Sequence, residues 1–320
     1  MTPSERPAGG GLGRLVAAAV AFALVAPAAL VALPLALLLA FTPLGNRGAV
    51  VFTGIAAGYS AWWLLGPGEL PDQLLRAALV LSATLFVALT LRTRLTFTHR
   101  AVAALAAAMA GCSVLLRMLG SSWSELSWWV ANRTGLAARD LTGMLWSRIP
   151  LDTASESGSG TLAQFEASLG TMVQIAAEFF PAITALQLVA GMALAAAIYQ
   201  RVAPRPQGVP LGRFRDLRFS EHLGWALAIP LVVVLVPKLA AFKAVAANTL
   251  VVAGALYALR GAAVVAYGVL ALGGSGFFLW AFWIVIFILL LPIVLGGAIL
   301  LGVLDGGLDL RRRWSRATSE

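Results

Sequence analysis

Long, uninterrupted apolar runs constrain this sequence more than any other feature. Eight of them are close to the ~20 residues that an α-helix needs to cross ~30 Å of hydrocarbon. In lipid every backbone N–H and C=O must be paired internally, so only helices or closed barrels span, and a barrel would show short runs of alternating polarity. The sequence therefore predicts an all-α bundle of about eight transmembrane helices. The runs cover residues 15–41, 50–65, 74–91, 102–119, 175–199, 223–240, 248–270 and 277–304.

Composition supports a membrane protein. Hydrophobic residues make up 60% of the 320 residues and charged residues 12%, whereas soluble domains carry roughly 25% charged residues. The net charge of +9 comes mainly from arginines scattered among the loops. It therefore indicates cytoplasmic loops of a membrane protein that face anionic lipid headgroups, and not a nucleic-acid partner. The single cysteine, Cys112, excludes an intrachain disulfide and is typical of a small buried hydrophobe.

The polar stretches divide the chain into five parts. The first apolar run starts like a signal peptide, with Arg14 before it, but it exceeds the ~7–15 apolar residues of such a segment. We therefore interpret it as a retained span, kinked at Pro27 and Pro34. The predicted parts are a disordered N-terminus (1–14), an N-terminal bundle of four spans (15–120), a Trp-rich insert (121–170), a C-terminal bundle of four spans (171–304) and a basic cytoplasmic tail (305–320).

The insert combines tryptophans with charged residues. Trp123, Trp128, Trp129 and Trp146 alternate with arginines over residues 122–148, which predicts an amphipathic helix at the headgroup level. A flexible acidic loop is expected at residues 151–160. We interpret the insert as an amphipathic spacer, with a substrate lid as the alternative.

The distribution of arginines gives conflicting indications of topology. The basic residues after Asp309 predict a cytoplasmic C-terminus. With eight spans, that assignment places the basic loops 92–100 and 201–218 outside, against the same rule. A re-entrant segment would remove the conflict, and the best candidate is residues 238–260.

Sequence signatures of enzymes and cofactor sites are missing. There is no phosphate-binding G-x-x-x-x-G-K-[ST] loop and no H-E-x-x-H zinc motif, and the only histidines are His99 and His222. Residues 273–276 are similar to the Gly-x-Ser-Gly of intramembrane serine proteases, but no histidine base follows Ser275. We therefore predict no enzymatic activity, no catalytic residue, no metal and no cofactor.

Arg260 is the most informative candidate for a ligand site. It lies about mid-membrane in the seventh run, where a charge is costly unless it is paired or hydrated. Tyr257 and Tyr267 share its helical stripe, so the three residues could line a cavity for an anionic or aromatic ligand. On that hypothesis Arg260→Leu would preserve folding and alter binding. Pairing with Glu178 or Asp305, or reaching the headgroups, stays an equal alternative.

Further residues of the C-terminal half are candidates for helix packing or ligand binding. Gly254, Gly261 and Gly268 repeat every seven residues, which predicts a helix face that packs closely against a neighbour. Asn248 joins the candidate ligand-binding set at the start of the seventh run. Glu178, which shares a helix face with Gln174, lies either at the headgroups or at the mouth of a site.

The C-terminal half carries four short motifs between residues 175 and 313. They are Phe180-Pro181-Ala182-Ile183, Leu211-Gly212-Arg213-Phe214 through Arg218, Asn248 with Leu256-Tyr257 and Arg260-Gly261, and Gly302-Val303-Leu304-Asp305 followed by Asp309-Leu310-Arg311. In these motifs the chain resembles the YybS-like family of bacterial membrane proteins, a domain of unknown function, although many relatives carry Gln at the position of Arg260. That family is similar in overall pattern to the substrate-binding (S) components of energy-coupling-factor transporters. The resemblance implies a subunit of the bacterial cytoplasmic membrane that captures a vitamin or metal ion and depends on a coupling protein and ATPases supplied in trans.

Together these observations predict a membrane-embedded binding or transport subunit without its own ATPase. The alternative is a structural or assembly scaffold that organises a membrane complex through its glycine and alanine faces. A membrane transferase is a weaker third interpretation, since the loops lack paired acidic motifs. A polar cavity near mid-membrane would distinguish a transporter from a scaffold, whose interior should be fully packed.

Overall fold

The structure is a computed structural model, and it describes residues 10–42, 47–146, 156–212, 214, 217, 221–271 and 291–308. These residues form α-helices and short 3-10 turns, with no strand among them. The predicted all-α membrane bundle is therefore confirmed as a fold class. The chain divides after Leu211 into two compact units, each considered by itself: Met1–Leu211 and Gly212–Glu320.

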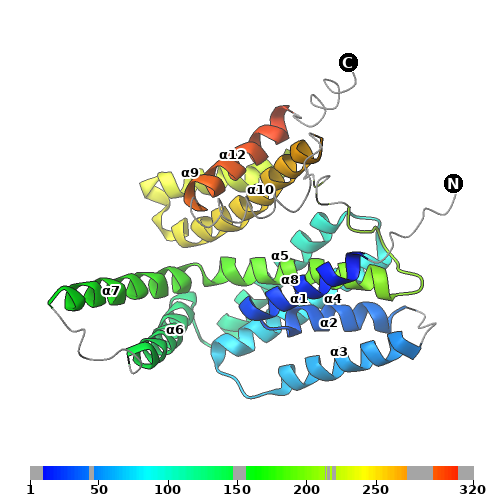
Figure 1. The fold of residues 1–320 in the computed structure, drawn as a ribbon, viewed down its shortest axis with the longest axis horizontal. Coiled ribbons are helices and arrows are strands. Elements are labelled where there is room, and N and C mark those ends of the chain that lie inside the picture. The colour runs from blue at the N-terminus through cyan, green and yellow to red at the C-terminus, as the bar shows by residue number, and fades with distance from the viewer. Residues whose placement is uncertain are drawn as a thin grey trace. The chain divides into compact units, whose positions relative to one another are not determined.

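Eight helices make up the described part of the first unit (Figure 1). Four of them, α3, α4, α5 and α8, are long and apolar enough to cross a membrane. The helices are α1 (Gly10–Val25), α2 (Ala29–Ala40), α3 (Arg47–Leu65), α4 (Leu70–Arg92), α5 (Phe97–Met118), α6 (Trp123–Trp146), α7 (Glu156–Glu178) and α8 (Phe180–Val202).

The short helix α2 is the most buried element of this unit. It packs against α3, α4 and α8, and the side chains of Leu30, Leu38 and Leu39 are fully buried because almost every residue of the helix is apolar. The backbone of α8 approaches it closely at Gly191, where a Cβ atom would lie 2.6 Å from the carbonyl oxygen of Leu30. Three of the four long helices, α3, α4 and α8, therefore pack around α2.

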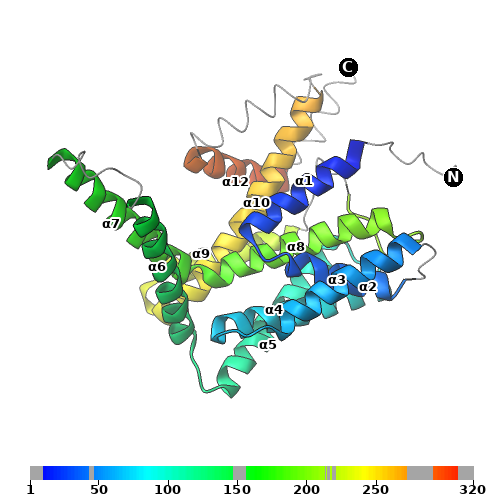
Figure 2. The ribbon, with the colours of Figure 1, turned by 60° about the horizontal axis from the view of Figure 1, so that its bottom comes forward.

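The first apolar run forms two helices, so the predicted single span kinked at Pro27 is wrong in this respect. α1 ends at Val25 and α2 begins at Ala29, with Pro27 in the break. Figures 1 and 2 show both helices running from the break toward the same end of the unit, as a V. Gln187 of α8 donates a hydrogen bond to the carbonyl oxygen of Val25 at 2.9 Å, which gives the end of α1 a partner that water cannot supply in lipid. Pro34 lies inside α2.

The insert is a pair of helices. α6 and α7 lie side by side and extend from the bundle, and α7 continues into α8 after Phe179 (Figures 1 and 2). Leu126 and Val130 anchor the first turns of α6 in the apolar core of the bundle. The Trp-rich stretch is thus helical, as predicted, whereas residues 156–160 of the expected flexible loop belong to α7, and residues 151–155 lie outside the described part.

The second unit contains a short helix beside a long one. Its described elements are η3 (Glu221–Gly224), α9 (Trp225–Leu235), η4 (Pro237–Phe242), α10 (Lys243–Ala271) and α12 (Leu291–Leu308). α9 has 11 residues, about 16 Å at 1.5 Å per residue, which is too short for the predicted sixth span. The segment Pro237–Gly268 is long and apolar enough to cross.

Five candidate spans therefore lie in the described residues, and the count of eight stays a prediction. Residues 243–260, which were expected to belong to a re-entrant segment, are part of the continuous helix α10. The two helices that turn back on each other are α1 and α2 instead (Figure 1). Residues 10–14 of the expected disordered N-terminus are helical in α1. Residues 1–9, 277–290 and 309–320, on which other predictions fall, lie outside the described part, as do residues 273–276.

Candidate functional site

A tight turn between α3 and α4 builds the polar site of the first unit. The sequence Gly66-Pro67-Gly68-Glu69 cannot continue a helix, and Glu69 caps α4 with an extended backbone. Its side chain accepts from the backbone of Asp72, and the Asp72 carboxylate accepts from the backbone N–H of Glu69 at 3.2 Å. This reciprocal capping box fixes both carboxylates at the start of α4.

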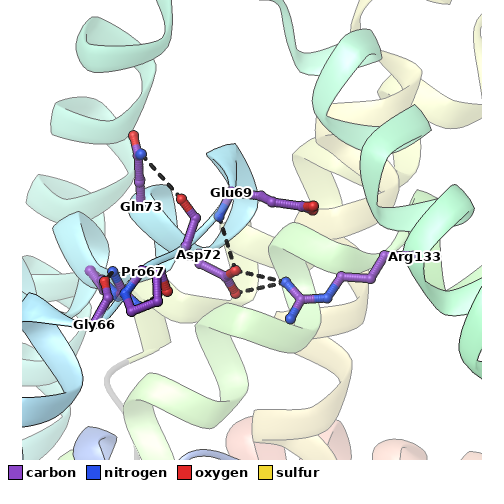
Figure 3. Close-up of polar contacts among 8 residues, drawn as sticks. Gly66, Pro67, Glu69, Asp72, Gln73 and Arg133 are labelled. Carbon is purple, nitrogen blue, oxygen red and sulfur yellow. Dashed lines mark hydrogen bonds and ion pairs between the residues drawn. The ribbon is translucent and has the colours of Figure 1, made fainter.

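Arg133 of α6 reaches this capping box. Its Nη1 lies 2.8 Å from both carboxylate oxygens of Asp72 (Figure 3). The two side chains are 58% and 28% exposed, so the ion pair is largely hydrated and contributes little to stability, about 0.2–1 kcal/mol. Its effect is to hold α6 over the first turn of α4.

The turn itself is held by Arg76 of α4. This guanidinium donates to the carbonyl oxygens of Gly66 and Pro67, the second at 3.0 Å, and lies 5.4 Å from the centre of the Trp63 ring. Gly68 is required here because a Cβ atom would lie 2.8 Å from the Cβ of Asp72. The turn is therefore a rigid support for the polar groups above it.

An open pocket of about 370 Å³ lies between the turn and α6. Arg133 offsets the charge of Asp72, while Glu69 has no basic partner among the residues that the structure describes. An indole, an amide and this carboxylate together can receive a small molecule that carries a positive charge. The pocket is lined by Pro67, Gly68, Glu69, Asp72, Trp129, Asn132, Arg133 and Leu136.

Arg260, the candidate favoured by the sequence, lies in the second unit on α10. Its Nε donates to Oδ2 of Asp305 on α12 at 3.0 Å, and the two side chains are 7% and 1% exposed. Tyr257 is buried beside it and Tyr267 is half-buried. The structure thus brings Arg260 to the carboxylate that the sequence offered as the alternative to a ligand.

Glycines let α10 and α12 meet at their backbones around this ion pair. A Cβ at Gly261 would overlap the carbonyl oxygen of Ala298, and one at Gly302 would overlap that of Tyr257. Gly254 faces the side chain of Ile299, with 3.6 Å to its Cδ1. Gly268, the third residue of the predicted glycine face, is half-buried. The crossing is close because at each of these two contacts one helix presents a glycine, which has no Cβ to hold the backbones apart.

The other two candidate ligand residues lie apart from this ion pair along the chain. Asn248 is half-buried and donates to the carbonyl oxygen of Ala244 within α10. Glu178 is exposed at the last position of α7, in the first unit. In the described part of the chain no group of three or more His, Cys, Asp and Glu residues could hold a metal ion.

Sequence reasoning missed the pocket and its residues. Part of the signal was present, because Gly66-Pro67-Gly68 marks a turn before an apolar run and Asp72 is an acidic residue suited to the first turn of a helix. The contact of Arg133 with Asp72 joins residues 61 positions apart, and nothing in the local pattern indicates it.

In the described part of the chain, this arrangement of long apolar helices, an interrupted helix and a buried ion pair is that of a multi-pass helical membrane protein. The chain belongs to the family described as "Predicted membrane protein (DUF2232)", whose model matches residues 14–306. No curated protein and no solved structure matches it.

Proposed function

We propose that this protein is a non-enzymatic binding subunit of the bacterial cytoplasmic membrane, and that its ligand is a small ammonium-bearing molecule held in the pocket between the 66–69 turn and α6. The observation that carries this proposal is the pocket itself, in which Glu69, Trp129 and Asn132 surround about 370 Å³ above a rigid turn. Small-molecule sites are typically concave, largely preformed and supplied with a few fixed polar groups.

The charge balance of the pocket favours a cation. The Asp72 carboxylate is occupied by Arg133, which leaves the Glu69 carboxylate to attract a positive group. Trp129 adds an indole, the best aromatic partner for an ammonium ion. The amide of Asn132 can donate to or accept from a polar group next to that ammonium.

Interrupted helices support a role in transport. α1 and α2 are separated at Pro27, and α9 is separated from η4 at Val236. Discontinuous helices are frequent at the substrate sites of membrane transporters. The proposal keeps the likeness to the YybS-like family and to the S components, and with it a multi-pass topology in which a coupling protein and ATPases in trans supply the energy.

The second candidate function is a structural or assembly scaffold. It is favoured by the crossing of α10 and α12, where Arg260 is neutralised by Asp305 and the backbones touch at Gly261 and Gly302. On either proposal Arg260 has a structural role, because its guanidinium is already engaged inside a closely packed helix pair.

Co-purification tests the proposal. The full chain is purified in mild detergent, and small molecules and proteins that accompany it are identified by mass spectrometry. Glu69→Gln removes the charge and keeps a side-chain oxygen of the same reach, because the Gln amide oxygen can still accept a hydrogen bond at the start of α4. Glu166→Gln on the exposed face of α7 is the matched control.

We expect an amine-bearing compound with the natural protein and the control, and its loss in Glu69→Gln. The same compounds in all three samples would contradict the proposal that the pocket binds the ligand. A constant set of proteins without any small molecule would favour the scaffold.

A further inference from the structure

Arg100 is the most deeply buried charged residue among those that the structure describes in the first unit. It belongs to the first turn of α5 and is only 2% exposed. Its Nη2 donates to the carbonyl oxygen of Val209 at 2.9 Å, and its guanidinium lies 5.7 Å from the centre of the Phe86 ring. The side chain is thus enclosed by α4, α5 and the segment after α8.

The charge of Arg100 is not neutralised within the described part of the chain. No carboxylate forms an ion pair with it there, and its Nε is buried without a hydrogen-bond acceptor. The sequence contains no Asp or Glu at all from 73 to 124 or from 179 to 215. The N-terminus of α5 adds the positive end of a helix dipole at the same place. A buried guanidinium in such surroundings would be stabilised by an anion that also accepts from its Nε.

Other positive charges gather at this end of the unit. The ends of α2, α4 and α8 and the starts of α3 and α5 lie together there (Figures 1 and 2). Exposed arginines stand at or next to these helix ends: Arg47, Arg92, Arg94, Arg201 and Arg205. The positive-inside rule assigns this end to the cytoplasm, and a cluster of arginines attracts phosphate groups.

The segment that covers Arg100 is weakly held. Residues 204–210 are exposed and have no regular secondary structure. Apart from the bond from Arg100 to Val209, the backbone N–H of Gln207 donates to the Tyr199 hydroxyl at 2.9 Å. Segments with few buried contacts open at low free-energy cost.

Gly208 lets this segment lie directly on Arg100. Its φ of +81° favours glycine, and a Cβ atom would lie 2.7 Å from the carbonyl oxygen of Thr90 and 3.1 Å from Nη1 of Arg100. A methyl group at residue 208 would push residues 204–210 away from Arg100.

We propose that Arg100 anchors a phosphoryl-anion site beneath residues 204–210, distinct from the pocket at the turn before α4. The anion displaces the Val209 carbonyl and accepts hydrogen bonds from the Nε and Nη2 edge of the guanidinium, the paired geometry that arginine offers to phosphate. The phosphoryl group belongs to an anionic phospholipid or to a soluble phosphate compound.

Binding to the purified full chain in detergent tests this site, with phosphatidylglycerol and inorganic phosphate as the two probes, followed by native mass spectrometry and calorimetry. Arg100→Gln is compared with Arg117→Gln, an exposed arginine at the other end of α5. We expect Arg100→Gln to weaken binding roughly tenfold or more and Arg117→Gln to leave it unchanged. Loss confined to phosphatidylglycerol identifies the lipid as the source, and loss with both probes identifies the phosphoryl group itself as sufficient. Equal binding by the two variants overturns the proposal.

A second variant, Gly208→Ala, tests whether residues 204–210 cover the site, while Arg100 is kept. Gly208→Ala should strengthen binding of the same probes, because the clash with Thr90 opens the segment in advance, while Gly212→Ala, which has open space around it, should not. If Arg100→Gln does not fold, the comparison of Gly208→Ala with Gly212→Ala tests the proposal by itself. Unchanged affinity in Gly208→Ala overturns the site beneath the segment.

Discussion

Two buried arginines, one in each unit, differ in the kind of partner they have and in the packing around it. Arg260 meets Asp305 at 3.0 Å, between helices whose backbones touch. Arg100 meets a main-chain carbonyl oxygen and an aromatic ring, beneath a segment with little to hold it. A neutralised arginine inside close packing is a structural element, whereas an unneutralised one under a loose cover is suited to receive an anion. Burial of a charge therefore says less about its role than the partner it has and the packing around that partner.

The largest effect is expected from Arg260→Leu. The change leaves the Asp305 carboxylate buried without its cation, which should lower the free energy of unfolding by about 3–5 kcal/mol. Chemical unfolding in detergent measures it. This expectation replaces the one made from the sequence, that the variant would fold normally.

The double variant Arg260→Leu/Asp305→Leu is the control for that experiment. It removes both charges, and a buried ion pair replaced by apolar residues is often neutral for stability. Stability close to that of the natural protein is expected. A double variant as unstable as the single one would show that the ion pair is not the cause.

The close crossing of α10 and α12 should give the next largest effect. Gly261→Ala places a Cβ on the carbonyl oxygen of Ala298, so the helices must separate, at an expected cost of about 1–3 kcal/mol. Gly254→Ala on the same helix meets Ile299 at an ordinary contact distance and should leave stability unchanged or raised. The same unfolding assay compares the two variants. Equal losses of unfolding free energy would contradict the close contact between α10 and α12 at Gly261.

Arg100→Leu sharpens the comparison with Arg260. No carboxylate is left unpaired, so the expected loss is about 0.5–1.5 kcal/mol, the net value of one hydrogen bond. A loss as large as that of Arg260→Leu, measured in the same detergent, would mean that Arg100 has an acidic partner and would remove the contrast between the two arginines.

The smallest effect is expected at the surface pair. Arg133→Gln should lower the free energy of unfolding by about 0.2–1 kcal/mol, because the ion pair with Asp72 is hydrated. Arg139→Gln, an exposed arginine further along α6, should change nothing measurable. Salt at high concentration should erase the difference between them.

The sequence predicts the class of fold well because run length and composition determine it. It also names Asp305 as a possible partner of Arg260, since a charge at that depth needs one. It cannot choose between that partner and a ligand, because the choice depends on Gly261 and Gly302 bringing α10 and α12 together.

Two of the predicted spans differ from a single long helix in the structure, each for its own physical reason. The run 15–41 is long enough for one crossing helix, but Gln187, 162 residues later, supplies the hydrogen bond that makes a break at Val25 tolerable. α9 stops at Leu235 because Pro237 follows, so a long apolar run yields a short helix. The burial of Arg100 is equally invisible, since Val209 lies 109 residues away.

The bond between Gln187 and Val25 also has a consequence for biogenesis. Ribosomes add about 5–20 residues per second, so roughly 8–30 s separate the synthesis of the acceptor from that of its donor, 162 residues later. During that interval the carbonyl oxygen of Val25 must be met by water, by the insertion machinery or by a transient partner, because it cannot be left bare in lipid. During synthesis, α1 and α2 are therefore expected to stay at the edge of the bilayer. They should adopt their V-shaped arrangement only after α8 has been made and inserted.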